Sequence, residues 1–183
     1  MLEATVRKVV ILAVLGSALL MTGCGDLLSL HPLYTGQDRV FDAALEGRWE
    51  DDDNLLTVER SGDSYEVVLR SKKDPSEKQT YEMYLVNLGG VRFADILPTG
   101  GILGHMFLKV RVSASDLRIA FFDSTWLRER VPHEDVLVAK GNRQAVLIAH
   151  TPELRKQVEK YAAAPEAYDD EIGYRRAPAT APQ

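Results

Sequence analysis

Short windows in which apolar and polar residues alternate recur along the chain, and they constrain its fold more than any other feature of the sequence. The most regular windows are 56–59, 65–70, 80–85, 106–112 and 117–121. A period of two places successive side chains on opposite faces of a strand, so that one face is buried and the other is solvated. These windows therefore predict half-buried strands of an antiparallel sheet.

Less regular apolar runs raise the number of predicted strands to about nine; they lie at 47–50, 91–97, 136–140 and 145–149. Turn residues separate neighbouring runs, as in Ser61-Gly62-Asp63 and Gly89-Gly90. Sequential hairpins need only such short connections, whereas parallel pairing needs long crossovers. The pattern predicts a mainly β domain, an antiparallel meander of eight or nine strands that forms a barrel, a sandwich or a curved open sheet.

Two helices are predicted alongside the strands. Asp123 or Ser124 can cap a short helix. Thr151 as N-cap, followed by Pro152 at the first helical position, is a start signal for a second helix. The apolar residues of this second helix share one face, which we expect to pack on the sheet: Leu154, Val158, Tyr161 and Ala162.

The composition excludes several classes of protein. With 45% apolar residues and a formal net charge of −5, the chain is too hydrophobic and too weakly charged to be disordered throughout. A mildly acidic chain lacks the basic surplus that is typical of nucleic-acid-binding proteins, so we predict no nucleic-acid partner. The single cysteine, Cys24, excludes an intramolecular disulfide.

The first 24 residues have the three parts of an export signal. Arg7 and Lys8 precede an apolar run of about 13 residues, which is shorter than the roughly 20 residues that a helix needs to cross the hydrocarbon core. The run leads into the small residues Thr22 and Gly23, which stand where a signal peptidase would cut, directly before Cys24. These features predict a signal peptide and not a membrane-spanning helix.

The sequence Met21-Thr22-Gly23-Cys24 resembles the lipobox of bacterial lipoproteins, although Met21 stands where the lipobox most often has Leu. The resemblance implies that the Cys24 thiol receives a diacylglycerol, that the signal is cut before Cys24 and that the new amine is acylated. Because Gly25 and not Asp follows Cys24, it also implies the periplasmic face of the outer membrane where the organism has two membranes. An ordinary secretory signal with a stray cysteine and an uncleaved signal anchor remain as alternatives.

The segment from Gly25 to Val40 is unusually apolar for a tether. Fully extended, it reaches about 50 Å, which is enough to hold a domain clear of the lipid headgroups. It contains several leucines, and Pro32 favours an extended conformation. Two interpretations stay open: this arm packs along the domain, or it is an exposed docking strip. Burial of Leu33 and Tyr34 would favour the first.

Six short motifs are distributed over most of the chain after Cys24: Ser-Leu-His-Pro-Leu-Tyr-Thr at 29–35, Val-Phe-Asp at 40–42, Leu-Glu-Gly-Arg-Trp at 45–49, Leu-Gly-Gly at 88–90, Phe-Asp-Ser-Thr-Trp-Leu at 122–127 and Thr-Pro-Glu-Leu at 151–154. This set resembles an uncharacterised family of predicted bacterial lipoproteins. The resemblance implies an envelope location and a single domain, but it brings no activity. Gly47-Arg48-Trp49 also resembles the Gly-x-Trp with which lipocalin and calycin barrels open.

The chain is therefore predicted to have four parts. Residues 1–23 form the lipoprotein signal peptide, and 24–40 hold the lipidated Cys24 and the apolar arm. A β-rich domain follows over 41–164. The remaining residues, 165–183, are rich in proline, alanine and charged residues, which predicts a flexible tail.

Motifs for catalysis and metal binding are sparse. The sequence has no glycine-rich phosphate loop, no Gly-x-Ser-x-Gly elbow and no paired-histidine metal helix. We interpret His133 and its acidic neighbours as a solvated loop. The acidic run Asp51–Asp53 lacks the spacing of a calcium loop and predicts a hairpin turn. No enzyme activity, metal or cofactor is predicted.

Asp95 is the one charged residue that stands out within a predicted strand. If Val91, Phe93 and Leu97 point inward, Asp95 points inward as well, where a carboxylate needs a partner or has a raised pKa. Such an inward Asp95 would mark a polar spot in a pocket. If Ile96 points inward instead, Asp95 faces water.

These features predict a membrane-anchored lipoprotein of the cell envelope. Its partners are the membrane, reached through the acyl chains on Cys24, and either an envelope protein or a small apolar ligand. A protein partner makes the domain a recognition or assembly module, with a filled core and an exposed apolar patch or strand edge. The alternative, a binder of a small apolar ligand or lipid, needs a barrel cavity of roughly 300 Å³ or more.

Overall fold

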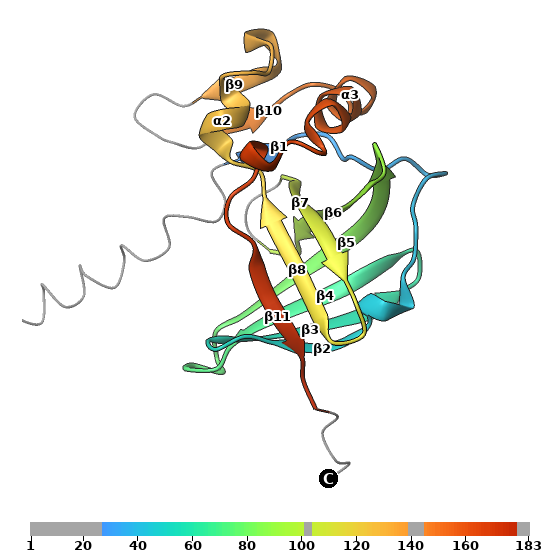
Figure 1. Ribbon diagram of the computed structural model, residues 1–183, viewed down its shortest axis with the longest axis vertical. Helices are drawn as coiled ribbons and strands as arrows, with labels where there is room; N and C mark the ends of the chain where they lie inside the picture. The colour runs from blue at the N-terminus through green and yellow to red at the C-terminus, as the bar shows by residue number, and fades with distance from the viewer. Residues whose placement is uncertain (1–26, 101–103, 139–144, 179–183) are drawn as a thin grey trace, which may run out of the picture.

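The computed structural model describes residues 27–100, 104–138 and 145–178, and it is mainly β (Figure 1). Eight strands close into a barrel in the order β11-β2-β3-β4-β5-β6-β7-β8, and every neighbouring pair is antiparallel. The barrel strands are β2 (Gly47–Glu50), β3 (Asn54–Ser61), β4 (Ser64–Ser71), β5 (Lys78–Leu88), β6 (Val91–Pro98), β7 (Met106–Val112), β8 (Asp116–Phe121) and β11 (Ile172–Arg176). The predicted mainly β fold is confirmed, and the closed barrel is the arrangement that forms.

A second, three-stranded sheet lies at one end of the barrel (Figure 1). Its central strand β10 (Ala145–Leu147) pairs in parallel with β1 (Leu27–Ser29) and in antiparallel with β9 (Val136–Val138). All nine predicted strands form, but β9 and β10 belong to this small sheet and not to the meander. Strand β1 lies in the arm, where the alternation predicts no strand.

The predicted flexible tail is wrong over its first part. Pro165–Ala167 form the short 3-10 helix η3, and β11 lies between β2 and β8. In the register, Ile172 is opposite Ile119 and Arg176 is opposite Trp49. Because β11 pairs with both neighbours, it closes the barrel and covers the two strand edges that β2 and β8 would otherwise expose.

The two predicted α-helices form at the expected places. The Asp123 carboxylate accepts a hydrogen bond from the backbone N–H of Trp126 (2.8 Å), so the predicted cap is confirmed. Thr151 is the first helical residue and not the side-chain cap, because its hydroxyl donates to the carbonyl of Pro32 (2.8 Å). The helical elements besides η3 are α2 (Ser124–Arg128), α3 (Thr151–Tyr161) and the 3-10 helices η1 (Ala43–Leu45) and η2 (His133–Asp135). Within the described ranges, none of these helices has the length and apolar character that crossing a bilayer requires.

Two predicted turns have the backbone geometry that their residues favour. Gly89 and Gly90 join β5 to β6 with φ values of 57° and 76°, a left-handed conformation that glycine adopts without strain. The Asp51 carboxylate accepts hydrogen bonds from the backbone N–H groups of Asp53 (2.8 Å) and Asn54 (2.6 Å). The acidic run is thus the hairpin turn that the sequence predicts.

The protein has two hydrophobic cores, one inside the barrel and one outside it. We define the cap as residues 27–34, 122–138 and 145–168, which cover the outer wall of the barrel at one end (Figure 1). Because side chains alternate along a strand, one strand can contribute to both cores. On β6, Phe93 belongs to the cap core and the next residue, Ala94, belongs to the barrel core. The barrel core consists of Leu45, Trp49, Leu56, Val58, Tyr65, Val67, Met83, Leu85, Ala94, Leu108, Val110, Leu117 and Tyr174.

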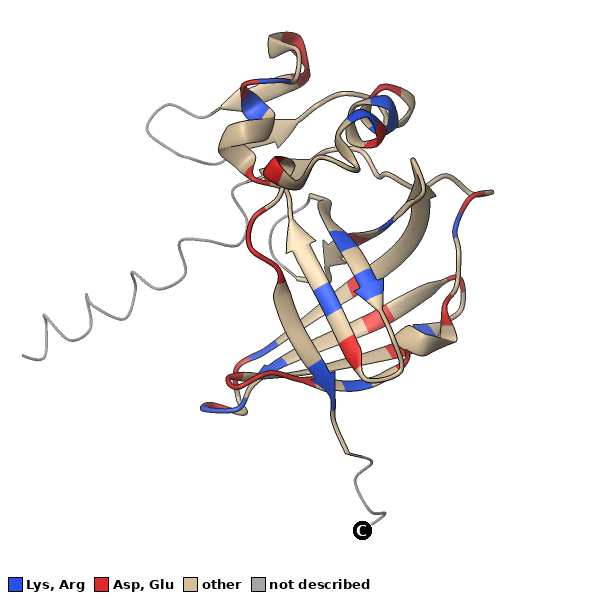
Figure 2. Ribbon diagram, in the orientation of Figure 1, with Lys and Arg blue, Asp and Glu red and all other residues tan. Residues whose placement is uncertain are grey.

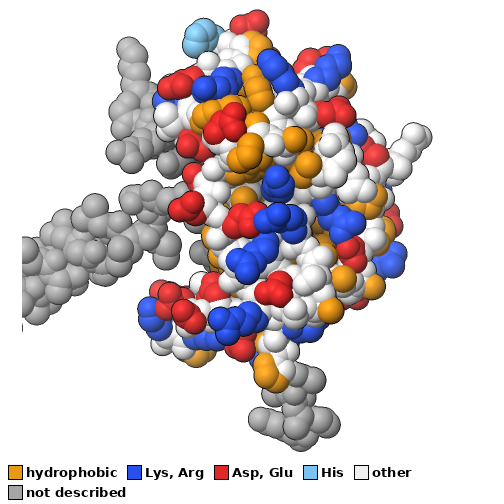
Figure 3. Space-filling view, in the orientation of Figure 1, with side chains coloured by type: hydrophobic (Ala, Val, Ile, Leu, Met, Phe, Trp, Pro, Cys, Tyr) orange, Lys and Arg blue, Asp and Glu red, His pale blue; other side chains and the backbone are white. Residues whose placement is uncertain are grey.

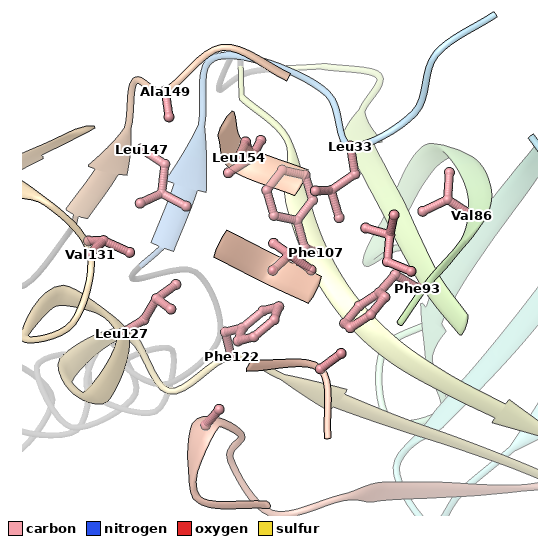
Figure 4. Packing of buried hydrophobic residues seen from close by; sticks show 14 residues of the cluster. Leu33, Val86, Phe93, Phe107, Phe122, Leu127, Val131, Leu147, Ala149 and Leu154 are labelled. Atoms are coloured by element: carbon pink, nitrogen blue, oxygen red, sulfur yellow. The ribbon is translucent and has the colours of Figure 1, made fainter. Parts of the chain in front are cut away.

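The cap core joins the arm, helix α3 and the small sheet to the barrel wall. In Figure 4, Leu33 from the arm and Leu154 from α3 lie against Phe107 of β7. The rings of Phe93 and Phe122 are stacked with centroids 5.9 Å apart. Leu154 and Val158 are buried, as the predicted apolar face of this helix requires.

Candidate functional site

Asp95 is completely buried between the barrel wall and the arm. Ile96, its neighbour on β6, packs against the barrel core, so Asp95 points to the outside of the barrel. It does not face water there, because the arm covers it. The prediction that an outward Asp95 is solvated is therefore wrong, and so is the prediction that a buried Asp95 lines the inside of a pocket.

Both oxygens of Asp95 have partners. Oδ2 accepts a hydrogen bond from the backbone N–H of Leu33 (2.6 Å), and Oδ1 lies 2.6 Å from Nδ1 of His105. Burial raises the pKa of Asp95, while the His105 ring and the Leu33 N–H oppose that rise. The carboxylate thus connects β6 to the arm and to the residue that precedes β7.

An aromatic pair lies beside this carboxylate. The rings of Tyr34 in the arm and Tyr84 on β5 are stacked with centroids 3.9 Å apart, and the Arg39 guanidinium lies 5.6 Å from the centre of the Tyr84 ring. The Tyr84 hydroxyl donates to Glu82 (2.7 Å). Burial, together with this hydrogen bond to a carboxylate, raises the pKa of Tyr84, so its hydroxyl stays protonated at neutral pH.

Helix α3 holds the other side of the arm. Nη1 of Arg155 donates to the carbonyl of Leu33 (2.7 Å), and the same guanidinium is paired with Asp38. Ser29 and His105 exchange two backbone hydrogen bonds of 2.8 and 2.9 Å. Leu33 is fully buried, which shows that the arm packs along the domain. The arm as a whole is thus not an exposed docking strip, although Leu30 within it is 55% exposed.

The Asp95–His105 pair has the orientation of a carboxylate that positions a histidine base. A hydrolytic site also needs a nucleophile next to the other ring nitrogen of the histidine. Ser29, whose backbone pairs with that of His105, donates its hydroxyl to the carbonyl of His31 (2.8 Å). What this group does in the structure is fasten the arm to the barrel.

Large side chains occupy the inside of the barrel. Trp49 and Tyr65 are at most 1% exposed, and Met83 and Leu108 belong to the same cluster. An eight-stranded barrel is just wide enough for its own side chains to fill it, or for one small ligand in their place. The residues of the barrel core that are buried include these four large side chains, whereas Tyr81 and Ile96 are only partly buried against them.

The Gly-x-Trp motif lies at the end of this barrel that η1 covers. The Trp49 indole N–H donates to the carbonyl of Leu45 (2.8 Å). The Arg176 guanidinium of β11 lies 4.1 Å from the centre of the Trp49 ring and donates to the carbonyls of Ala44 (2.6 Å) and Glu46 (3.0 Å). The Arg176 side chain thereby connects β11, the last barrel strand, to β2, the first.

Exposed large hydrophobic side chains are concentrated on the cap. Leu30 (55% exposed), Leu137 (57%) and Val138 (48%) belong to the small sheet or extend it, whereas Phe41 (40%) lies under the guanidinium of Arg60. In Figure 3, apolar side chains gather over the cap, and the barrel strands below show more charged ones. Lys, Arg, Asp and Glu are interspersed over both parts in the view of Figure 2.

Strand β9 has a free edge within the described part of the chain. It pairs with β10 on one side and with no other described strand. Its three residues include Leu137 and Val138, whose side chains are about half exposed. An unpaired strand edge offers backbone N–H and C=O groups to the strand of another protein.

Other residues that the sequence singled out have simple roles or lie outside the described residues. Cys24, the predicted lipidation site, is in the part of the chain that the structure does not describe. His133 and its acidic neighbours form η2, where Asp135 accepts a hydrogen bond from the Gln157 amide (2.6 Å). In residues 27–100, 104–138 and 145–178, no group of three or more histidine, cysteine or acidic side chains is placed to hold a metal ion.

The comparisons with known proteins do not assign the chain to a family. No family model matches it. Curated proteins and solved structures give no significant match either. The likeness of its motifs to predicted lipoproteins, and of Gly47-Arg48-Trp49 to lipocalins, therefore stays a prediction. The residues of the described chain and their geometry are therefore the basis for a proposed function.

The sequence gives no signal for the group around Asp95 beyond the carboxylate itself. Its two partners are 62 and 10 residues away in the sequence. Only the placement of the arm over β6 brings Leu33 and His105 to it. The free edge of β9 is also not predicted from the sequence, because an apolar run predicts a strand but not the sheet to which the strand belongs.

Proposed function

We propose that this protein is a lipid-anchored lipoprotein of the bacterial cell envelope whose barrel is a non-catalytic recognition or assembly module. The signal pattern that ends at Cys24 supports the anchor. The first described strand, β1 (Leu27–Ser29), lies only a few residues after Cys24 in the sequence. Where the organism has two membranes, the periplasmic face of the outer membrane is the expected location.

The burial of large side chains inside the barrel is the observation that carries the choice of a recognition module. A binder of small molecules buries most of its ligand in an apolar cavity. Here Trp49 and Tyr65 are at most 1% exposed, so they take up part of the interior that such a ligand would need. Contact with a macromolecule uses the surface instead, and that leaves the interior free to stabilise the domain.

The free edge of β9 is the surface to which we assign a protein partner. The edge is short and carries the exposed apolar side chain of Val138. A partner strand that pairs with β9 would satisfy its backbone groups and cover this side chain.

Cross-linking in intact envelopes, followed by purification of the full acylated protein, tests this role. We expect wild type to capture one partner in a reproducible ratio. Val138→Lys, which places a charge on the edge, should reduce that capture severalfold. Lys156→Glu on the exposed face of α3 is the matched control, and its capture should equal that of wild type. Equal capture by all three proteins, or capture of no partner, contradicts the proposal.

A small apolar ligand in the barrel is the second candidate, and the closure of eight strands is the observation that favours it. Organic extraction of the same purified sample distinguishes the two functions. A recognition module should release only the lipids that co-purify with any acylated protein. One extra apolar molecule per chain would favour the ligand binder and contradict the recognition module.

A further inference from the structure

One face of the small sheet is made only of aliphatic residues. Leu28, Val146 and Leu137 are opposite one another in the register of β1, β10 and β9, so their side chains lie on the same face. Two residues further along, Leu30 and Ile148 continue this face. We call these five residues the outer face of the small sheet.

The opposite face of the same sheet belongs to the cap core. Ala145 is buried there, and Leu147 is buried in one cluster with Leu154 and Val158 of α3. On the outer face, Val146 and Ile148 are partly buried. Leu28 is buried beside Gly104, but Leu30 and Leu137 are more than half exposed.

Very little chain separates this sheet from the predicted anchor. Only Gly25 and Asp26 lie between Cys24 and Leu27, the first residue of β1. Even fully extended, that connection spans only about 10 Å. The arm therefore does not supply the 50 Å tether that its length suggests, because it is folded onto the domain from Leu27 onward.

A connection of this length keeps β1 at the membrane. The acyl chains on Cys24 would lie in the hydrocarbon core, and the polar headgroup layer on each side of that core is roughly 5–8 Å thick. The first residue of β1 would thus be in or directly above the headgroup layer. The adjacent apolar side chains, Leu30 and Leu137, are the described groups that gain by leaving water there.

We propose that the outer face of the small sheet is a membrane-contact surface, which lies on the bilayer that the acyl chains of Cys24 enter. This inference rests on the proposed lipid anchor. The contact is apolar and not electrostatic, since the five residues carry no charge and the chain as a whole is acidic. It fixes the orientation of the barrel relative to the membrane and leaves the free edge of β9 beside the lipid surface.

Site-specific quenching by lipids tests the contact. Acylation consumes the thiol of the single native cysteine, so one introduced cysteine can be labelled alone. Leu137→Cys places a bimane fluorophore on the outer face. Lys156→Cys places it on the exposed side of α3, across the sheet. Each full acylated protein is reconstituted in phosphatidylethanolamine–phosphatidylglycerol vesicles that carry a nitroxide on the upper acyl chain.

We expect severalfold stronger quenching at Leu137→Cys than at Lys156→Cys, with little change on adding salt, because an apolar contact is not screened. Both substitutions replace exposed side chains, and circular dichroism checks that both proteins fold. Equal quenching of two acylated proteins overturns this inference and leaves the anchor intact. Protein that carries no acyl chain overturns the anchor and this inference together. Weak quenching combined with cross-linking of position 137 to a protein in intact envelopes would assign the face to that protein instead.

Discussion

A single buried carboxylate, Asp95, connects three separate segments of the chain. It accepts a hydrogen bond from the Leu33 backbone, contacts the His105 ring and belongs to the barrel wall. A buried polar group that loses its partner costs about 1–3 kcal/mol, and more where a charge is involved. We therefore expect the loss of the Asp95 carboxylate to lower the stability of the folded protein.

Replacing Asp95 tests this role. Asp95→Ala leaves the Leu33 N–H and the His105 ring without their acceptor and should lower the free energy of unfolding by about 2–3 kcal/mol. Asp95→Asn keeps the size and one acceptor oxygen, so it should cost clearly less. Urea unfolding followed by circular dichroism measures both. Equal losses in the two variants would mean that the hydrogen bonds of Asp95 contribute little.

The pH dependence of stability gives a second residue-scale prediction. Burial raises the pKa of Asp95 in the folded protein, so folding favours its protonated form. The stability that this group contributes is complete below the ordinary aspartate pKa of about 3.9 and is lost as the pH rises through the raised value. The free energy of unfolding of wild type should therefore fall relative to that of Asp95→Asn as the pH rises above about 4. A constant or rising difference contradicts the raised pKa.

At the scale of the elements, buried apolar contacts hold the arm on the domain. Leu33 is fully buried in the cap core beside Phe107 and Leu154. Leu33→Ala leaves a cavity and should cost about 2–4 kcal/mol in urea unfolding. Leu30→Ala is the matched control, because Leu30 is 55% exposed, and it should change stability by less than about 0.5 kcal/mol. Similar losses in both variants would contradict the docked arm.

Strand β11 closes the barrel, so removing it should have a different effect from removing the end of the chain. Deletion of 165–183 takes away β11 and leaves one edge of β2 and one edge of β8 unpaired. We expect this protein to aggregate or to lack a cooperative urea transition. Deletion of 179–183 alone removes no described residue and should leave the transition midpoint unchanged. A cooperative, soluble 1–164 protein would show that β11 is dispensable.

The elements differ in how far the sequence predicts them. Alternation finds β3, β4, β5, β7 and β8, less regular apolar runs find β2, β6, β9 and β10, and Gly89-Gly90 marks a turn whose conformation glycine favours. Strand β11 is missed because only five residues pair, within a stretch rich in proline and charge. Its stability comes from the edges of β2 and β8, which lie far away in the sequence. Local pattern contains no information about such pairing.

At the scale of the whole molecule, the cap lies at one end of the barrel, and the predicted anchor precedes β1, the first strand of the cap, in the sequence. The anchor lies three residues before β1, the outer face of the small sheet is aliphatic, and the barrel extends from the other side of the cap (Figure 1). A long tether would let the domain turn freely above the membrane. The short connection that we propose would instead set which end of the molecule meets the lipid.

The acylation of Cys24 is the claim on which this account depends most. After trypsin digestion, the first cleavage site beyond Cys24 is Arg39, so one peptide, 24–39, carries the mature N-terminus. Mass spectrometry of the protein purified from membranes should find this peptide beginning at Cys24 and carrying a diacylglycerol with or without an amide-linked acyl chain. A palmitate analogue should label wild type and not Cys24→Ala. An unmodified Cys24 peptide, or equal labelling of both proteins, would contradict the account.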